Sequence, residues 1–588
     1  MLQQESPDLE KKNVPVKMRD GTILYANIYR PEKREKHPAI LIRLPYVKDS
    51  GFISNYMDPV RMVRAGYVLV IQDCRGTGAS EGEYHQFVND AEDGYDTVEW
   101  VASQPWCDGN VGMCGLSYLG ATQMLAAIMR PPHLKAICPA QVSHSLRGMP
   151  MWENGVFLLQ LSLMWLNGQI ASELAKGDLP PERLKSLRER FQNLMKNPEE
   201  SCRVLPLVDA PTNQIAKELR LGSTYSDWIT HIEDDTFWKK LYNPLPLEKV
   251  AIPALHLGGW YHHVITSAVL KDYMVIKQRG PSEFVRKNQK LLIGPWVHVG
   301  SSGLVGEIDF GPSAAGSSIN YLGMHIRWFD YWLKGINNGI MDEPPVRIFV
   351  MGDNVWRDEK EWPLARTRYT DYYFHSGGHA NSRAGDGTMS IRMPDEEEAD
   401  NYLYDPRNPV PTKIGKSSDF ISNIFGAQDQ QYIEDRTDVL VYTTPILKTD
   451  VEVTGPITIK LYASSSAVDT DFSGKLVDVW PDGKAYNVVD GVIRARYRKS
   501  ISKPQLIKPG KVYEYTIDLR SSSIVFKAGH RIRIEISSSS FPKWDRNLNT
   551  GHPIGQDAEI KVAQQTIFHN QQYPSHIVLP VIPREVKK

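Results

Sequence analysis

A serine between glycines gives the clearest indication of chemistry in this sequence. Ser117 follows the apolar run 110–114 and precedes the helical pattern of 121–127. A strand that turns sharply into a helix at a serine lifts the hydroxyl clear of the sheet and places it at a helix N-terminus, where developing negative charge is stabilised. The second glycine, Gly120, stands one residue later than in the usual G-x-S-x-G pattern. We interpret Ser117 as a candidate nucleophile for acyl transfer; a glycine-flanked strand–helix junction without catalysis is the alternative.

A serine nucleophile needs a base within hydrogen-bond reach. Where such a serine turn belongs to an α/β-hydrolase fold, the base is a histidine on the loop after the last strand. The apolar run 290–293 is followed by Gly294, Pro295 and then His298, so His298 is the expected base. A structural histidine in a surface loop is the alternative, because the chain has 16 histidines.

The elements that would position these residues alternate between strand and helix patterns. Short apolar runs are typical of strands buried on both faces, and a helical pattern over 90–103 lies among them. This alternation predicts an α/β-hydrolase fold with a mostly parallel sheet over residues 1–141 and 247–344. The apolar runs are 39–42, 67–71, 111–114, 134–138, 254–257 and 290–293.

Two further domains are expected. Residues 142–246 show helical patterns and no obvious strands, so they predict a helical cap domain inserted over the active site, where ligands of such folds bind. In residues 345–588 helical periodicity fades, and the strict alternation of 457–462 and 531–536 predicts half-buried strands. This half is expected to be a C-terminal all-β jelly-roll domain.

Composition excludes several classes of protein. The 588 residues carry a net charge of −1, so no basic footprint indicates nucleic acid or an anionic membrane. No apolar stretch approaches the roughly 20 residues that span a bilayer, and the N-terminus lacks the pattern of a signal peptide. Five sparse cysteines are typical of free thiols in a reducing compartment, which favours a cytoplasmic location. A mature secreted form would look the same.

Motifs along the whole chain resemble one family. They are 43–46 (RLPY), 72–82 (QDCRGTGASEG), 93–100 (DGYDTVEW), 104–113 (QPWCDGNVGM), 115–120 (GLSYLG), 259–261 (GWY), 294–298 (GPWVH), 306–312 (GEIDFGP) and 328–335 (WFDYWLKG). In this order they resemble the CocE/NonD family of serine hydrolases, in the X-Pro dipeptidyl-peptidase clan. That family's serine turn also has its second glycine displaced.

The resemblance implies a role for four residues. Ser117 matches the family nucleophile and His298 its general base. Tyr46 matches the tyrosine whose hydroxyl helps to form the oxyanion hole, and the backbone N–H of Tyr118 would be the second donor. Taken without the family, Tyr46 reads as an aromatic side chain packing beside Pro45.

One position departs from the family pattern. Family members read Gly-Trp-Tyr-Asp, and the aspartate is the acid of the triad, whereas this chain has His262 in that place. A neutral imidazole supplies no negative charge to stabilise an imidazolium at His298. Three interpretations stay open: another carboxylate orients His298, from the helical insertion or from Glu307 and Asp309; His262 itself orients His298; or the chain is an impaired or repurposed homologue.

Two other sets of residues lie near these positions. Trp260, Tyr261 and Trp296 are expected to line the substrate pocket, with burial in the core as the alternative. The histidines at 256, 262, 263 and 298 show none of the known zinc spacings, so no metal site is expected.

Together these patterns predict a serine hydrolase that cleaves an ester or amide bond of a small substrate through an acyl-enzyme on Ser117, with no cofactor. The alternatives are an X-Pro dipeptidyl-peptidase, an α-amino acid ester hydrolase or acyltransferase, and a catalytically impaired binding protein on a hydrolase scaffold. The large β domain and the cap offer surfaces for a homo-oligomer.

Overall fold

The N-terminal part of the chain is organised by one sheet. The computed structural model describes residues 9–31, 35–51, 53, 57–142, 151–177, 179–221, 225–241, 246–413 and 425–584. Within these ranges ten strands pair in the order β1-β2-β4-β3-β5-β6-β9-β10-β13-β14. Neighbours from β4 to β13 are parallel, and antiparallel pairs lie at both edges. Their bounds are β1 Leu9–Lys17, β2 Ile23–Tyr29, β3 His37–Leu44, β4 Val68–Asp73, β5 Cys107–Leu116, β6 Leu134–Ala140, β9 Ala254–Gly259, β10 Gln289–Gly294, β13 Val346–Val350 and β14 Val355–Glu359.

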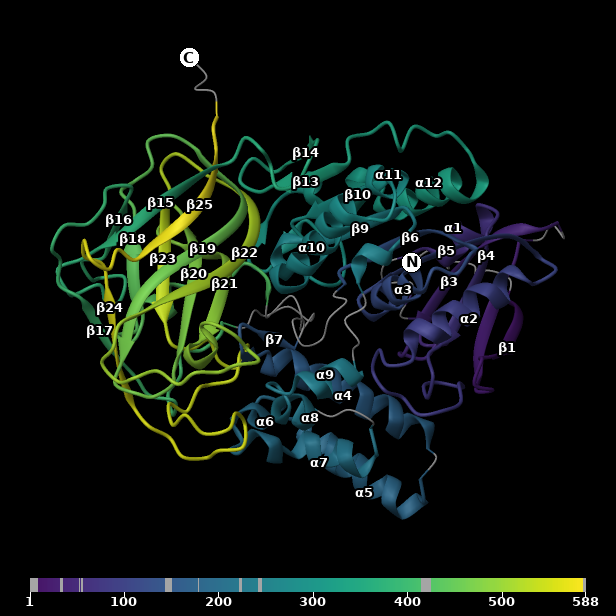
Figure 1. Ribbon diagram of the computed structural model, residues 1–588, viewed down its shortest axis with the longest axis horizontal. Coiled ribbons are helices and arrows are strands. Elements are labelled where there is room, and N and C mark those ends of the chain that lie inside the picture. Colours follow the sequence, from purple (N-terminus) through teal and green to yellow (C-terminus); the bar gives the residue numbers. More distant parts are fainter. Residues whose placement is uncertain are drawn as a thin grey trace.

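Helices cover both faces of this sheet (Figure 1). Alternate residues of β3 enter two different cores: Ile40 and Ile42 pack with α1 and α12, whereas Leu41 packs with α2, α3 and α10. Because the central strands are buried on both faces, each contains a short apolar run, and these are the six runs that the sequence shows. All six runs lie in the sheet. The helices are α1 Pro59–Arg64, α2 Asp90–Ala102, α3 Tyr118–Met129, α10 His263–Arg279, α11 Glu283–Lys287 and α12 Tyr321–Lys334.

The segment between β6 and β9 is mainly helical, as its sequence predicts, but it begins with a small hairpin. Strands β7 (Trp152–Glu153) and β8 (Val156–Phe157) pair antiparallel, which the sequence pattern did not indicate because each has only two residues. The helices that follow share one hydrophobic core, to which the hairpin and the β-domain residues Tyr497 and Phe541 also contribute. They are α4 Leu159–Lys176, α5 Pro181–Leu194, α6 Glu200–Arg203, α7 Pro211–Glu218, α8 Tyr225–Thr230 and α9 Asp235–Leu241.

The C-terminal part is an antiparallel β domain. Eleven strands of the described residues form one sheet system, in which β16–β18 is the parallel exception. The expected boundary after residue 344 differs from the structure, because β13 and β14 belong to the first sheet. The bounds are β15 Arg368–His375, β16 Thr388–Ser390, β17 Asp400–Tyr404, β18 Leu440–Thr443, β19 Val451–Ser465, β20 Asp471–Val479, β21 Ala485–Arg494, β22 Tyr513–Phe526, β23 Arg531–Ser537, β24 Ala563–Phe568 and β25 His576–Ile582, with the short helix α14 Gln431–Glu434.

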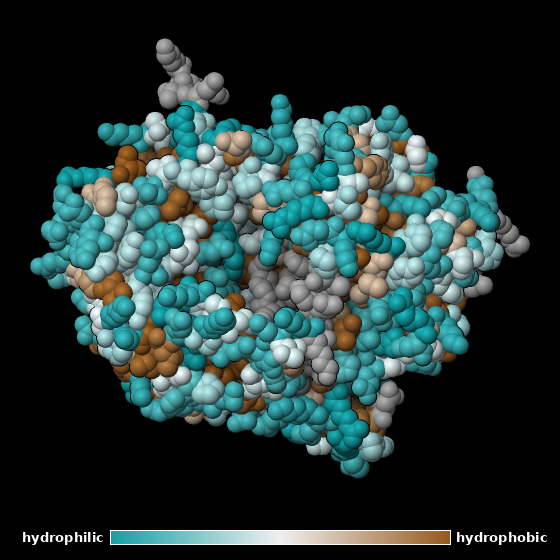
Figure 2. All heavy atoms as spheres, viewed as in Figure 1, coloured by the Kyte–Doolittle hydropathy of each residue, from teal (hydrophilic) through white to brown (hydrophobic). Residues whose placement is uncertain are grey.

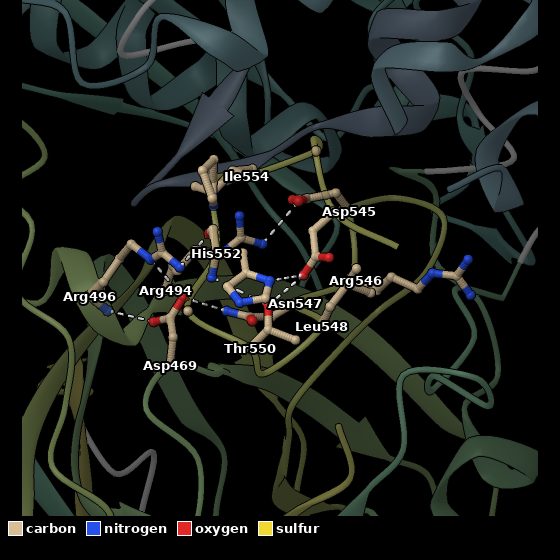
Figure 3. A pocket seen from close by; sticks show the side chains of 14 residues that line it. Asp469, Arg494, Arg496, Asp545, Arg546, Asn547, Leu548, Thr550, His552 and Ile554 are labelled. Atoms are coloured by element: carbon tan, nitrogen blue, oxygen red, sulfur yellow. Dashed lines mark hydrogen bonds and ion pairs between the residues drawn. The ribbon is translucent and has the colours of Figure 1, made fainter. Parts of the chain in front are cut away.

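Buried charges join the helical segment to the β domain. The Asp545 carboxylate accepts a hydrogen bond from the backbone N–H of Phe157 at 2.7 Å and pairs with Arg494 at 3.0 Å. Arg494 also pairs with Asp471 at 2.9 Å. Figure 3 shows Arg494 and Asp545 at a small crevice of about 30 Å³ beside the loop that carries His552. The hairpin that opens the helical segment is therefore fixed to the β domain.

The face of the molecule shown in Figure 2 is mostly hydrophilic, with apolar surface in separate patches. Among the described residues, no helix combines the length and the apolar character needed to cross a membrane.

Candidate active site

Ser117 stands at the junction of β5 and α3 in a strained backbone conformation. Its φ is 62° and its ψ −123°, a region that residues with a side chain rarely adopt. Two backbone hydrogen bonds hold it: the Ser117 N–H donates to Ala140 at 2.9 Å, and the Gly120 N–H donates to the Ser117 carbonyl at 2.8 Å. The turn places the serine side chain at the N-terminus of α3, the geometry that the sequence predicts.

The displaced glycine has a packing reason. Gly115 has a φ of 147°, and a Cβ added there would lie 2.5 Å from the Cβ of Leu119. A Cβ at Gly120 would lie 2.8 Å from Val142, just beyond β6. Leu119 is fully buried, and its side chain fills the space above Gly115. The backbone of α3 therefore comes closest to the end of β6 at Gly120, one residue later. The turn therefore needs glycine at 120 and an apolar residue at 119.

Tyr46 lies at the serine, as the family resemblance implies. Its hydroxyl is hydrogen-bonded to the side chains of Ser117 and Trp165, the indole N–H of Trp165 being a donor. Burial raises the pKa of Tyr46 to about 12, so the hydroxyl keeps its proton at neutral pH. Trp165 comes from α4, and the sequence analysis did not place it at the site.

His298 and His262 contact each other. The Nδ1 atoms of the two rings are 3.1 Å apart, and the ring centroids 4.5 Å apart with an interplanar angle of 61°. For this hydrogen bond to form, one ring carries its proton on Nδ1 and the other accepts there. His262 is almost fully buried and lies edge-on to Phe425 at 4.8 Å.

Backbone contacts interlock the two histidine loops. The Tyr261 N–H donates to the Trp296 carbonyl at 3.1 Å, and the Gln141 side chain donates to the Val297 carbonyl at 2.9 Å. A Cβ at Gly259 would lie 2.3 Å from the Trp296 carbonyl oxygen, so only glycine permits this approach. The ends of β6, β9 and β10 therefore fix the histidines relative to one another.

The two carboxylates named as candidate orienters contact other groups. Glu307 pairs with Lys413 at 2.9 Å and accepts a hydrogen bond from the Asp429 backbone at 3.3 Å. Asp309 accepts from the Gly311 N–H at 2.8 Å within its own turn. The direct contact between the histidine rings supports the interpretation that His262 orients His298.

The Tyr118 side chain belongs to the support beneath the site. Its hydroxyl donates to Asp90 at 2.6 Å and accepts from the Phe87 N–H at 2.9 Å, and Asp90 pairs with buried Arg43 at 3.1 Å. Its backbone N–H lies in the first turn of α3, where amides have no acceptor within the helix. If Tyr118 contributes to an oxyanion hole, it does so through this backbone N–H and not through its side chain.

These residues surround one cavity of about 180 Å³. It brings together all five residues expected at the catalytic centre and others that the sequence analysis missed. Three of the missed residues, Leu161, Met164 and Trp165, form an apolar stripe on α4, and this spacing in the sequence could have indicated them. The described lining residues are Tyr46, Gln86, Phe87, Ser117, Tyr118, Gln141, Met151, Leu161, Met164, Trp165, His262, Ile265, His298 and Val299.

The three aromatic residues expected in the substrate pocket are buried outside this lining. Trp260 donates its indole N–H to the Phe349 carbonyl at 2.8 Å, and Trp296 donates to the Ala314 carbonyl at 2.8 Å. Tyr261 is 1% exposed, and its hydroxyl lies 3.4 Å from the Asn487 carbonyl. Neighbouring positions on a loop point in different directions, so nearness in sequence to His262 and His298 did not place these rings in the cavity.

The described residues contain no group of three or more His, Cys, Asp or Glu side chains that could hold a metal ion.

Comparisons with known proteins cover nearly the whole chain. A family model described as X-Pro dipeptidyl-peptidase (S15 family) matches residues 20–300, and one described as the X-Pro dipeptidyl-peptidase C-terminal non-catalytic domain matches residues 338–578. The cocaine esterase of Rhodococcus sp. (strain MB1 Bresler) is 39% identical over 582 residues, which are 97% of this chain and 98% of that protein.

Solved structures show the same architecture. An aminopeptidase from the marine sediment archaeon Thaumarchaeota archaeon matches with a TM-score of 0.80 at 25% identity, over 99% of this chain and 98% of that one. An α-amino acid ester hydrolase matches with a TM-score of 0.79 at 25% identity, again over 99% and 98%.

Proposed function

Because the chain belongs to the X-Pro dipeptidyl-peptidase (S15) family, in its CocE/NonD group of serine hydrolases, we propose that it cleaves the ester or amide bond of a small neutral substrate through an acyl-enzyme on Ser117. The observation that carries this proposal is the meeting of Ser117, Tyr46 and His298 in one cavity. Esters are the favoured substrates, because the similarity to an esterase extends over 97% of the chain.

In the proposed reaction the Ser117 oxygen attacks the substrate carbonyl carbon, and His298 Nε2 takes the hydroxyl proton. The tetrahedral intermediate collapses as His298 returns this proton to the leaving alcohol, and the acyl group stays on Ser117. Water then attacks the acyl carbon while His298 takes one of its protons. The second intermediate releases the acid as His298 returns this proton to the Ser117 oxygen.

The carbonyl oxygen becomes negatively charged in each tetrahedral intermediate. Its proposed donors are the Tyr46 hydroxyl, which already lies at Ser117, and the Tyr118 backbone N–H at the start of α3. Removal of one such donor typically lowers turnover by about 10²–10³.

His262 is proposed to orient the base. For His298 to accept a proton at Nε2, its own proton must sit on Nδ1, and His262 Nδ1 then accepts that hydrogen bond. This contact fixes the tautomer and the ring orientation, but a neutral imidazole adds no negative charge beside the imidazolium. The proposed enzyme therefore works with an oriented base and without the charge of the usual triad acid.

The cavity favours an uncharged substrate. Its described lining contains no aspartate or glutamate to pair with a free α-ammonium group. An α-amino acid ester hydrolase remains the second candidate, since a structure with that activity in its name shares the fold. The two candidates differ in whether a free amino group next to the carbonyl helps or hinders turnover.

A labelling experiment tests the proposal. The wild-type protein is expected to react with a fluorophosphonate probe and to hydrolyse 4-nitrophenyl acetate, whereas Ser117→Ala and His298→Ala should lose both activities. A matched pair, the 4-nitrophenyl esters of butyrate and of 2-aminobutyrate, separates the two candidates, and the neutral ester should be preferred. Absence of labelling in the wild type would favour the binding-protein alternative.

A further inference from the structure

A second and larger cavity lies within the helical segment. This cap pocket, of about 410 Å³, runs between α4 on one side and the end of α5 with α6 on the other. It is open to solvent at Met195, which is 42% exposed. A pocket of several hundred Å³ with mainly apolar walls is the size at which proteins bind small organic molecules. Its described lining is Gln160, Leu163, Met164, Asn167, Gly168, Ala171, Phe191, Met195, Pro198, Glu199 and Cys202.

The cap pocket adjoins the catalytic cavity through one side chain. Positions 160, 163, 164, 167, 168 and 171 follow helical spacing and form one stripe of α4. Positions 161, 164 and 165 form a second stripe, which lines the catalytic cavity. Met164 belongs to both stripes, so its side chain stands between the two spaces. Methionine is unbranched and flexible, and it can move aside at low cost.

Two buried amide side chains line the cap pocket and have atoms with no hydrogen-bond partner in the described part of the chain. Among the described residues, neither Oε1 nor Nε2 of Gln160 has a hydrogen-bond partner, nor has Oδ1 of Asn167. Gln160 is 3% exposed and Asn167 9%. These atoms are buried beneath the pocket wall, and an unsatisfied buried amide destabilises the protein by about 1–3 kcal/mol. Either side chain therefore gains a partner if it turns toward a polar atom of a bound molecule. The walls around them are apolar, and the one carboxylate in the described lining belongs to the exposed Glu199, which favours an uncharged group at the buried amides.

We propose that the cap pocket binds the distal arm of an extended ester whose carbonyl lies at Ser117. The arm is a mainly apolar chain with an uncharged polar group such as a ketone, ether or amide, and it passes Met164 to reach Gln160 and Asn167. This inference rests on the proposed function and names its substrate class. From Met164 to Ala171 the stripe is about 10 Å long, so up to about eight carbons of a linear arm lie beyond Met164.

Gly168 allows a direct test. An added Cβ at this position meets nothing within 4 Å, so Gly168→Phe fills the cap pocket without a backbone clash, and Gly168→Ala is the matched control. Three substrates are compared. 4-Nitrophenyl acetate has no long arm, 4-nitrophenyl decanoate has a long acyl arm, and decyl acetate has a long alcohol arm. Each buried CH₂ contributes about fourfold to binding.

Gly168→Phe is expected to lower kcat/KM for one long ester by about tenfold or more, to leave acetate turnover within about twofold, and to leave Gly168→Ala like the wild type. The ester that loses activity identifies the arm. Acetate turnover shows that the variant is folded. If both long esters keep their ratio to 4-nitrophenyl acetate in Gly168→Phe, the inference is wrong while the proposed function stands.

A binding measurement separates the two proposals. Ser117→Ala is titrated with decyl acetate and with methyl decanoate by calorimetry, with and without Gly168→Phe. Loss of binding in the double variant supports the cap pocket even if the wild type hydrolyses no ester. Equal binding in both proteins overturns it. In Gln160→Met, an ester with a ketone halfway along its arm should lose its advantage over the plain chain, because the polar partner is gone.

Discussion

The replacement of the usual triad aspartate by His262 keeps one atom in place. The Nδ1 atom of histidine and the Oδ1 atom of aspartate are each bonded to Cγ, so both accept a hydrogen bond at nearly the same distance from the backbone. His262 contacts His298 through Nδ1, while the rest of its ring lies against Phe425. Position 262 thus offers His298 a hydrogen-bonding atom but no negative charge.

This comparison predicts a gain of activity in His262→Asp. A carboxylate at this place stabilises the imidazolium of His298, so kcat/KM should rise by about tenfold or more; loss of the acid's charge costs up to about 10⁴ in serine proteases. The carboxylate also raises the pKa of His298, which moves the acid limb of the pH–rate profile to higher pH. Steady-state kinetics from pH 5 to 9 measure both effects.

His262→Asn is the matched control, because asparagine offers an oxygen at the same position without the charge. It should behave like the wild type in rate and in pH profile. A rate of His262→Asp no higher than that of His262→Asn would show that another group supplies the charge.

Tyr46→Phe tests the oxyanion donor. Removal of the hydroxyl should lower kcat by about 10²–10³ and leave KM little changed, because the donor acts on charge that exists only in the transition state. Since burial raises the pKa of Tyr46 to about 12, the hydroxyl is a donor throughout the range from pH 7 to 10. The ratio of wild-type to variant rates should therefore be constant over that range. A ratio that falls toward pH 10 would contradict this role.

At the scale of the element, α12 carries a buried histidine that links acid to stability. His325 is 3% exposed, its Nδ1 donates to the Tyr321 carbonyl at 3.2 Å, and burial lowers its pKa from 6.5 to about 4. A group whose pKa is lower in the folded protein than in the unfolded chain stabilises the folded protein fully at pH values above its unfolded-state pKa. That stabilisation is lost as the pH falls from 6.5 through 4.

His325→Gln should flatten this acid dependence. From the two pKa values, the wild type loses about 2 kcal/mol through His325 between pH 7.5 and pH 5, and the variant, which cannot titrate there, loses that much less. Denaturant unfolding at both pH values measures the difference. Parallel losses in the two proteins would exclude His325 as a source of acid sensitivity.

At the scale of the whole molecule, the helical segment depends on the β domain for its position. Asp545 binds the backbone of Phe157 and the guanidinium of Arg494, all of them buried, and Arg494 also binds Asp471. The catalytic cavity draws Met151, Leu161 and other walls from residues next to this junction. Loosening the junction should disturb the cavity as well as the fold.

Asp545→Ala tests this coupling. The change leaves the Phe157 amide and one side of Arg494 without their partner, so the folded protein should lose about 2–3 kcal/mol, and KM should rise. Thermal and denaturant unfolding measure the first effect, and ester kinetics the second. Asp435→Ala is the control, because the Asp435 pair with Arg383 is exposed and such pairs contribute about 0–1 kcal/mol. Equal losses in the two variants would contradict the role of the junction.

Local chemistry let the sequence predict much of the site. The strand–turn–helix around Ser117 and the order of serine and histidine depend on short segments, so residue types and spacing suffice to place them. The parallel strands were equally visible, because burial on both faces makes each one a continuous apolar run. Motifs of the family added Tyr46 and showed that position 262 departs from the pattern.

The tertiary structure decided what the side chains face. Loops that interlock across the sheet decide three contacts. They bring His262 to His298, they turn Trp296 into the core, and they let Trp165 of a distant helix meet Tyr46. The β13–β14 pair joined the first sheet for the same reason, since strand pairing is a non-local choice that short alternating runs do not specify. Sequence by itself determined the fold class and the candidate reacting groups; only packing between segments far apart in the chain determined the cavity, its walls and the contact between His298 and His262.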